Sequence, residues 1–156
     1  MDESKTGKYI ITELKPNFRQ APSDRSPEDI AKAEKSHLQL LFLDDTVIKG
    51  AFYMECVWIW PGTEYYPTVA EPNAHAHDFD EVWIFTGTDR KNPRDLGGEL
   101  DFWLEDEHYV IDKSCIVYLP RGLKHGPCGI RRIDRPIFFV TAGNGTTYTR
   151  SSGQEY

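Results

Sequence analysis

Two short segments of the chain bring together residue types that bind transition metals. The first is His75-Ala-His77-Asp-Phe-Asp-Glu81, and the apolar run VWIF follows it directly. Residues two apart on a strand face the same side of a sheet, so His75 and His77 can direct both imidazoles at one point. The segment therefore predicts part of a metal site, provided that Glu81 reaches the same point.

Glu81 reaches the two histidines only if the chain bends. On a straight strand, the four residues from His77 to Glu81 span about 13 Å. Asp78 and Asp80 favour a bend there, because their side chains hydrogen-bond nearby backbone and tolerate turn geometry. A helix would place His77 and Glu81 on one face but His75 well around the cylinder, and the β-rich run that follows disfavours it.

The second segment is Pro120-Arg-Gly122-Leu-Lys-His125. Proline and glycine predict a tight turn, with His125 at the start of the next strand. Three neutral imidazoles and a carboxylate suit Mn, Fe, Ni, Co or Zn better than Ca or Mg. We expect one divalent transition metal, with Mn or Fe favoured.

The two spacings, HxHxxxE and then PxGxxH, resemble the two-part signature of the cupin superfamily over about residues 53–142. In cupins the first motif supplies two histidines and a glutamate, and the second supplies the last histidine. The resemblance thus implies His75, His77, Glu81 and His125 as the metal ligands. It also implies a jelly-roll β-barrel with the metal inside, and often a homodimer.

The chain departs from the usual cupin motifs at turn and edge positions. Val69, Ser114-Cys115 and Gly129 replace residues that are usually Gly, Gly-Asp and Asn, and Gly87 comes one residue early. The four positions that match the ligands are unchanged.

Strand alternation suggests which side chains line the interior. Counting from Glu81 places Trp83 and Phe85 inward, as core residues or as the apolar wall of a ligand cavity. Counting from His125 places Arg131 inward, where it would anchor a substrate carboxylate. A solvent-facing Arg131 in the charged run RRIDR remains the alternative.

Other polar side chains are candidates for a catalytic or structural role. Tyr118 is a candidate for substrate binding, although its facing is not fixed by the sequence. The candidates for a general base are Glu55, Glu99, Asp101 and Tyr118, and the catalytic residue stays unknown. His37 and His108 lie outside both motifs and are assigned structural roles. Cys128 falls on the opposite side of its strand from His125 by the same count.

The elements that must position these residues are mainly strands. Short β-branched and aromatic runs separated by turn formers predict strands over residues 37–43, 47–60, 81–85, 99–104, 115–119 and 137–141. Many strands without alternating helices predict an all-β sandwich or barrel.

One helix is predicted before the strands, with Ser26 as its N-cap and Pro27 in its first turn. An extended arm through Pro16 and Pro22 precedes it. The predicted organisation is an N-terminal arm and helix packed on the barrel over residues 1–36, the barrel over 37–145 and a polar tail over 146–156.

The connection over residues 88–98, TDRKNPRDLGG, is charged and longer than a hairpin needs. It is interpreted as a solvated surface loop, or alternatively as a lid or rim at the mouth of a pocket.

The composition excludes several kinds of partner. The net charge of −7 argues against nucleic acid or an anionic membrane surface. The first residues carry no apolar stretch of signal-peptide length, and the three cysteines show no CxxC spacing. We expect a cytoplasmic protein with reduced thiols.

These observations favour a metal-dependent enzyme that acts on a small oxygenated organic compound, by isomerase or lyase chemistry or as a dioxygenase. The alternative is a barrel that binds a metal or ligand without catalysis, such as a sensor. A structural dimer with an incidental metal is the third hypothesis.

Overall fold

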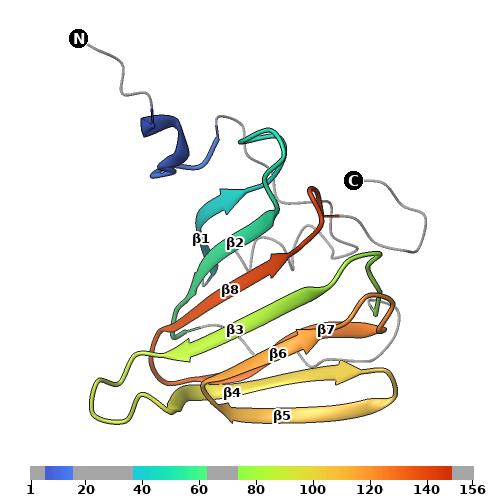
Figure 1. Ribbon diagram of the computed structural model, residues 1–156. Coiled ribbons are helices and arrows are strands. Elements are labelled where there is room, and N and C mark those ends of the chain that lie inside the picture. The colour runs from blue at the N-terminus through green and yellow to red at the C-terminus, as the bar shows by residue number, and fades with distance from the viewer. Residues whose placement is uncertain (1–5, 16–36, 63–73, 149–156) are drawn as a thin grey trace.

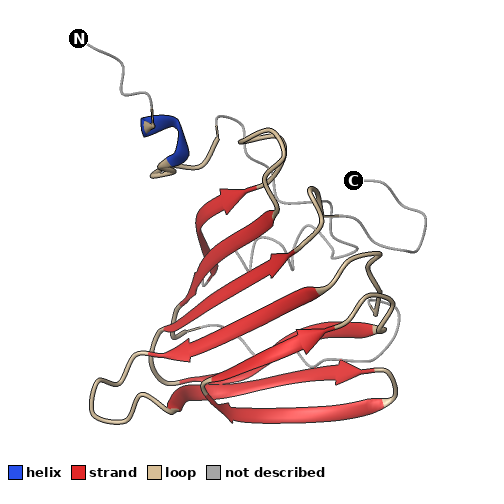
Figure 2. Ribbon diagram, in the orientation of Figure 1, coloured by secondary structure: helices blue, strands red, loops and turns tan. Residues whose placement is uncertain are grey.

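The computed structural model describes residues 6–15, 37–62 and 74–148, and every structural statement below concerns these ranges. The helix predicted from Ser26 to about residue 37 and most of the N-terminal arm lie outside the described residues. Within them, the only helix is a short 3-10 turn, η1 (Gly7–Tyr9), and no helix is long and apolar enough to cross a membrane (Figure 2).

In the described part of the chain, eight antiparallel strands form two sheets (Figure 1). The strands are β1 (His37–Leu43), β2 (Tyr53–Ile59), β3 (Glu81–Gly87), β4 (Asp95–Leu104), β5 (Glu107–Lys113), β6 (Cys115–Leu119), β7 (His125–Ile133) and β8 (Ile137–Gly143). The larger sheet has the order β1-β2-β8-β3-β6, and the smaller has the order β5-β4-β7. The all-β prediction is confirmed.

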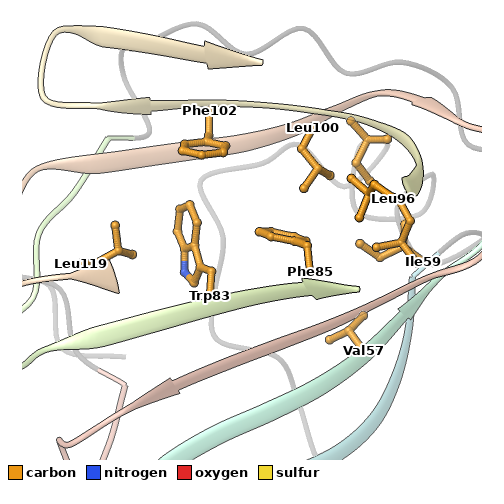
Figure 3. Packing of buried hydrophobic residues seen from close by; sticks show 10 residues of the cluster. Val57, Ile59, Trp83, Phe85, Leu96, Leu100, Phe102 and Leu119 are labelled. Atoms are coloured by element: carbon orange, nitrogen blue, oxygen red, sulfur yellow. The ribbon is translucent and has the colours of Figure 1, made fainter. Parts of the chain in front are cut away.

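The core lies between the two sheets, because alternate residues of each strand face inward. Trp83 and Phe85 of β3 meet Leu100 and Phe102 of β4 across the interior (Figure 3). The rings of Trp83 and Phe102 stand edge to face, with centroids 5.9 Å apart. The inward facing predicted for Trp83 and Phe85 is therefore confirmed.

The alternation predicted along β7 is wrong, because the pairing of β7 with β4 shifts register twice. Each shift reverses which face the following residues occupy. Cys128, predicted to face away, pairs with Phe102 and packs against the core. Arg131 points outward, with 41% of its side chain exposed, so it does not reach into the interior.

Candidate metal centre

The backbone places His75 beside His125. The His75 amide donates to the His125 carbonyl at 2.9 Å, and the His125 amide donates back at 2.8 Å. This reciprocal pair joins the first motif to the start of β7, so two histidines fifty residues apart in sequence stand next to each other. Their ring centroids are 4.6 Å apart.

The turn before His125 is fastened to the first motif. Gly122 has a φ of +82°, a conformation that side chains disfavour, and its amide donates to the His77 carbonyl at 2.9 Å. Leu123 closes the turn with a 3.0 Å bond to the Pro120 carbonyl. The tight turn predicted from Pro120 and Gly122 is confirmed.

The chain bends between His77 and Glu81, as the sequence predicted, and the bend falls at Asp78 and Phe79. Asp80 stabilises the bend through hydrogen bonds to residues far away in the sequence, and not through a local turn. Its carboxylate accepts from the Arg121 amide at 2.9 Å, and its own amide donates to Asn144 at 3.0 Å.

The bend brings Glu81 to the imidazoles. Oε2 of Glu81 lies 3.1 Å from Nε2 of His77 and 3.2 Å from Nε2 of His125. One ring nitrogen from each of His75, His77 and His125 lies within 4.8 Å of the others. The four side chains therefore converge, and the three imidazoles form a cluster that could hold a metal ion.

Thr141 on β8 fixes the orientation of the Glu81 carboxylate. Its hydroxyl donates to Oε1 at 2.7 Å, which leaves Oε2 directed at the histidines. Burial raises the pKa of this carboxyl, but the interactions with His125 and His77 outweigh burial and hold the pKa well below its usual range. Glu81 is therefore a carboxylate in this setting, the form that binds cations.

The hydrogen bonding of His125 tests whether a cation fits. Its Nδ1 lies 2.8 Å from the Leu123 carbonyl, and a carbonyl only accepts, so Nδ1 carries the proton. Nε2 of a neutral His125 then presents a lone pair to Oε2 of Glu81, and both atoms are buried without a hydrogen bond of good geometry. The two atoms need either a proton on Nε2, which makes His125 a cation and lowers the pKa of Glu81, or a metal cation held by both. The donors therefore fit a transition metal.

Phe79 supports His77 from behind. The two rings stack at 4.8 Å and an angle of 13°. Phe79 also packs directly on the backbone of Gly143 and Gly145, where an added Cβ would lie 2.4 Å and 2.6 Å from the ring. The glycines leave the space that Phe79 needs. Phe79 also lines an open depression of about 580 Å³ with Asp78, Asp80, Arg121 and residues 144–147.

Two further aromatic residues border the cluster. Trp83 stands edge to face with His125 at 5.4 Å, so part of the apolar core also forms a wall of the site. The Tyr148 hydroxyl lies 3.0 Å from Nε2 of His75. Tyr148 falls in the predicted tail, so at least residues up to 148 contact the barrel.

Sequence reasoning missed Thr141, Phe79 and Tyr148. Thr141 carried a signal, since it is the one polar residue in the otherwise apolar strand run IFFVT. Phe79 lies inside the first motif but offers no donor atom. Tyr148 has no local signal, because only the fold brings it to His75.

The remaining candidates lie in different places. Tyr118 is on the outer face of the larger sheet with 61% of its surface exposed. Glu99 pairs with Arg132, and Asp101 pairs with His108, on the outer face of the smaller sheet. Of the general-base candidates, only Glu55 faces the interior. It lies on the same side of β2 as Tyr53 and the core residue Val57.

The charged connection lies at the opposite end of the barrel. Glu81 begins β3 at the histidine cluster, and Gly87 ends β3 about 20 Å away. The loop from Thr88 to Arg94 follows Gly87 and is held there by Ser114, whose hydroxyl donates to the Pro93 carbonyl. The interpretation as a lid over the metal centre is wrong.

Comparison with solved structures identifies the fold. Oxalate oxidase in complex with glycolate is 16% identical, with 96% of this chain and 66% of that chain covered and a TM-score of 0.50. Peruvianin-I, a cysteine peptidase from Thevetia peruviana latex, is 12% identical, with coverages of 96% and 79% and a TM-score of 0.51. The DMSP lyase DddQ from Ruegeria pomeroyi DSS-3 is 19% identical over 85% of this chain, with a TM-score of 0.47.

The chain spans 58% of the length of the lyase and 66% of that of the oxidase. No protein-family model matches the chain, and no curated protein sequence does. The two-sheet jelly roll with its histidine triad has the fold of the cupin superfamily, as the two motifs predicted.

Proposed function

We propose that the chain is a metal-dependent cupin enzyme. In this proposal His75, His77, His125 and Glu81 hold one divalent transition metal, and a small oxygenated organic compound reacts there. The observation that carries the proposal is the contact between Glu81 and two imidazoles, one of which directs Nε2 at the carboxylate because its Nδ1 faces the Leu123 carbonyl.

The surrounding residues prepare the four donors. Thr141 orients Glu81, the Leu123 carbonyl sets the tautomer of His125, and Phe79 holds the His77 ring. Such supporting contacts raise the affinity and the precision of a metal site. Trp83 supplies an apolar wall that excludes water from one side of the cluster.

When bound, the metal would supply Lewis-acid chemistry at a coordinated oxygen or, if it is redox-active, reactivity with dioxygen. The first chemistry corresponds to an isomerase or lyase, and the second to a dioxygenase. The protein residues named above serve either reaction, since they position donors and exclude water.

Elemental analysis of the purified protein tests the site. We expect one equivalent of transition metal in the wild type and loss of most of it in His75→Ala, His125→Ala and Glu81→Gln. His108→Ala is the matched control, because His108 is an imidazole on the outer face of the smaller sheet. Equal metal content in the site variants and in the control would refute the proposal.

Turnover assays separate the classes of function. Oxygen uptake measured against catechols, thiols and keto acids detects a dioxygenase, and product analysis without oxygen consumption detects an isomerase or lyase. Tight ligand binding without turnover across the panel would instead support the non-catalytic, sensor-type barrel.

A further inference from the structure

A second carboxylate, Glu55, lies inside the barrel near the metal centre. On β2 it lies on the inward side with Tyr53 and Val57, and across the sheet it pairs with Thr141. Thr141 in turn contacts Glu81. A row of polar residues therefore crosses the interior face of the larger sheet from β3 through β8 to β2.

Glu55 is held in place from one side. The buried Tyr53 donates its hydroxyl to Oε1 of Glu55 at 2.5 Å. Burial raises the pKa of Glu55, hydrogen bonds from Tyr53 and Gln39 lower it, and the nearby charge of Glu81 raises it further. The net direction is upward because burial is the largest of these effects, and a cation beside the carboxylate would lower the pKa again.

The described residues include no buried lysine or arginine to balance Glu55. Their buried polar side chains are Asp44, His77, Glu81, Asp101, His125 and Thr141. Arg131, the predicted carboxylate anchor, points outward and lies near Asp101. The ammonium of Lys15 hydrogen-bonds Thr46 and lies 5.5 Å from the Phe42 ring centroid.

Aromatic rings surround the same region. Tyr53 packs against Tyr148 with ring centroids 5.0 Å apart and against Phe42 at 6.1 Å. Tyr148 links this group to the metal centre through His75. A carboxylate beside aromatic faces is a favourable setting for an organic cation.

We propose that Glu55, with Tyr53, forms a subsite for a cationic group of the substrate, such as an ammonium. This inference rests on the proposed function, because a second, oxygen-bearing group of the same molecule would reach the metal centre. A substrate with two carboxylates would meet Glu55 with like charge and bind poorly.

Matched ligands test the charge preference. The probes are ω-amino acids of three to five carbons, the monocarboxylic acids of the same lengths and the corresponding dicarboxylic acids, titrated into the metal-loaded protein by calorimetry. We expect the best amino acid to bind about tenfold tighter than the monocarboxylic acid of the same length, which lacks the ammonium, a difference of about 1.4 kcal/mol. The dicarboxylic acids should bind most weakly.

Glu55→Gln removes the charge and keeps the shape, so the tenfold preference should fall to within about twofold while metal content stays unchanged. Glu107→Gln is the matched control, because Glu107 also accepts from a tyrosine two residues away, Tyr109, but on the exposed strand β5. Tyr53→Phe, which retains the carboxylate, should weaken the preference only partly.

A preference that survives Glu55→Gln, or tighter binding of the dicarboxylic acids, would overturn the subsite. Titration of butylammonium into protein without metal tests the Glu55 subsite independently of the metal centre. Glu55-dependent binding of butylammonium by a wild type that takes up no metal would support the subsite and refute the metal centre.

Discussion

The hydroxyl of Thr141 lies 2.7 Å from Oε1 of Glu81, inside the barrel and on the neighbouring strand. This single bond decides which carboxylate oxygen faces His77 and His125. Because both side chains are buried, no water replaces the bond when it is removed.

Thr141→Val should therefore weaken metal binding. We expect the dissociation constant of the metal to rise about 10- to 100-fold, as is typical when a residue that hydrogen-bonds to a metal ligand is replaced. The free energy of unfolding of the metal-free protein should fall by about 1–3 kcal/mol, because Oε1 of Glu81 loses its partner. Competition with a chelator measures the first effect, and urea unfolding measures the second.

Thr86→Val is the control for this variant, since Thr86 is an exposed threonine on β3. Equal metal affinity in Thr141→Val and Thr86→Val would show that Thr141 does not position Glu81.

Gly143→Ala should damage the site through Phe79. The added methyl group would lie 2.4 Å from the Phe79 ring, so the ring must move and its stack on His77 is disturbed. We expect a loss of about 1–3 kcal/mol in the free energy of unfolding and a weaker metal site.

The double variant Gly143→Ala/Phe79→Leu provides the check. A smaller side chain at position 79 makes room for the methyl group, so the two substitutions should be less damaging together than their separate effects predict. Strict additivity of the two losses would contradict the contact as the cause.

Asp101→Ala should destabilise the fold without affecting the metal. Asp101 is 3% exposed and accepts from His108 at 3.0 Å, and His108 stacks on Trp103. Removal of a buried hydrogen-bonding partner lowers the free energy of unfolding by about 1–3 kcal/mol. Asp112→Ala, at an exposed position of β5, should change it by less than about 0.5 kcal/mol.

Metal content is the second measurement on Asp101→Ala. A loss of metal in this variant, with the fold retained, would mean that the outer face of the smaller sheet contributes to the centre after all.

The outer face of the larger sheet is the surface on which we expect the homodimer implied by the cupin resemblance. Leu38 on one edge strand and Ile116 and Tyr118 on the other are 52%, 68% and 61% exposed. Apolar side chains exposed at both edges of one sheet face suit a self-complementary, two-fold contact. Sedimentation analysis of the full chain should give a dimer.

Ile116→Lys should shift that dimer toward monomer, because it places a charge in the apolar contact. Val110→Lys, a substitution of another exposed aliphatic residue on β5 of the smaller sheet, should leave the dimer intact. A wild-type monomer at micromolar concentration would disprove this interface.

The local parts of the site were predictable from the sequence. The spacing HxHxxxE predicted that the two histidines face the same point and that the chain bends before Glu81. Pro120 and Gly122 predicted the turn that leads to His125. These features depend on few neighbouring residues, so the sequence carries them directly. The run CIVYL predicted β6 with the bounds that the structure has.

Features that depend on pairing between distant strands were not predictable. The facing of Arg131 follows from bulges in β7 whose position is set by β4. Strand β5 was not predicted, because its exposed, charged sequence shows little alternation and only Tyr109 and Ile111 pack against the core. The sequence also did not predict that Glu55 faces inward, because this follows from the pairing of β2 with β8.

The loop from Thr88 to Arg94 follows the end of β3 remote from the histidines and is exposed along most of its length. Its distance from the histidine cluster makes it a practical attachment point. A purification handle or a fluorescent reporter inserted between Lys91 and Asn92 would leave the four donor side chains and the Glu55 subsite undisturbed. The protein could then be immobilised in a defined orientation, with the histidine cluster turned toward solution.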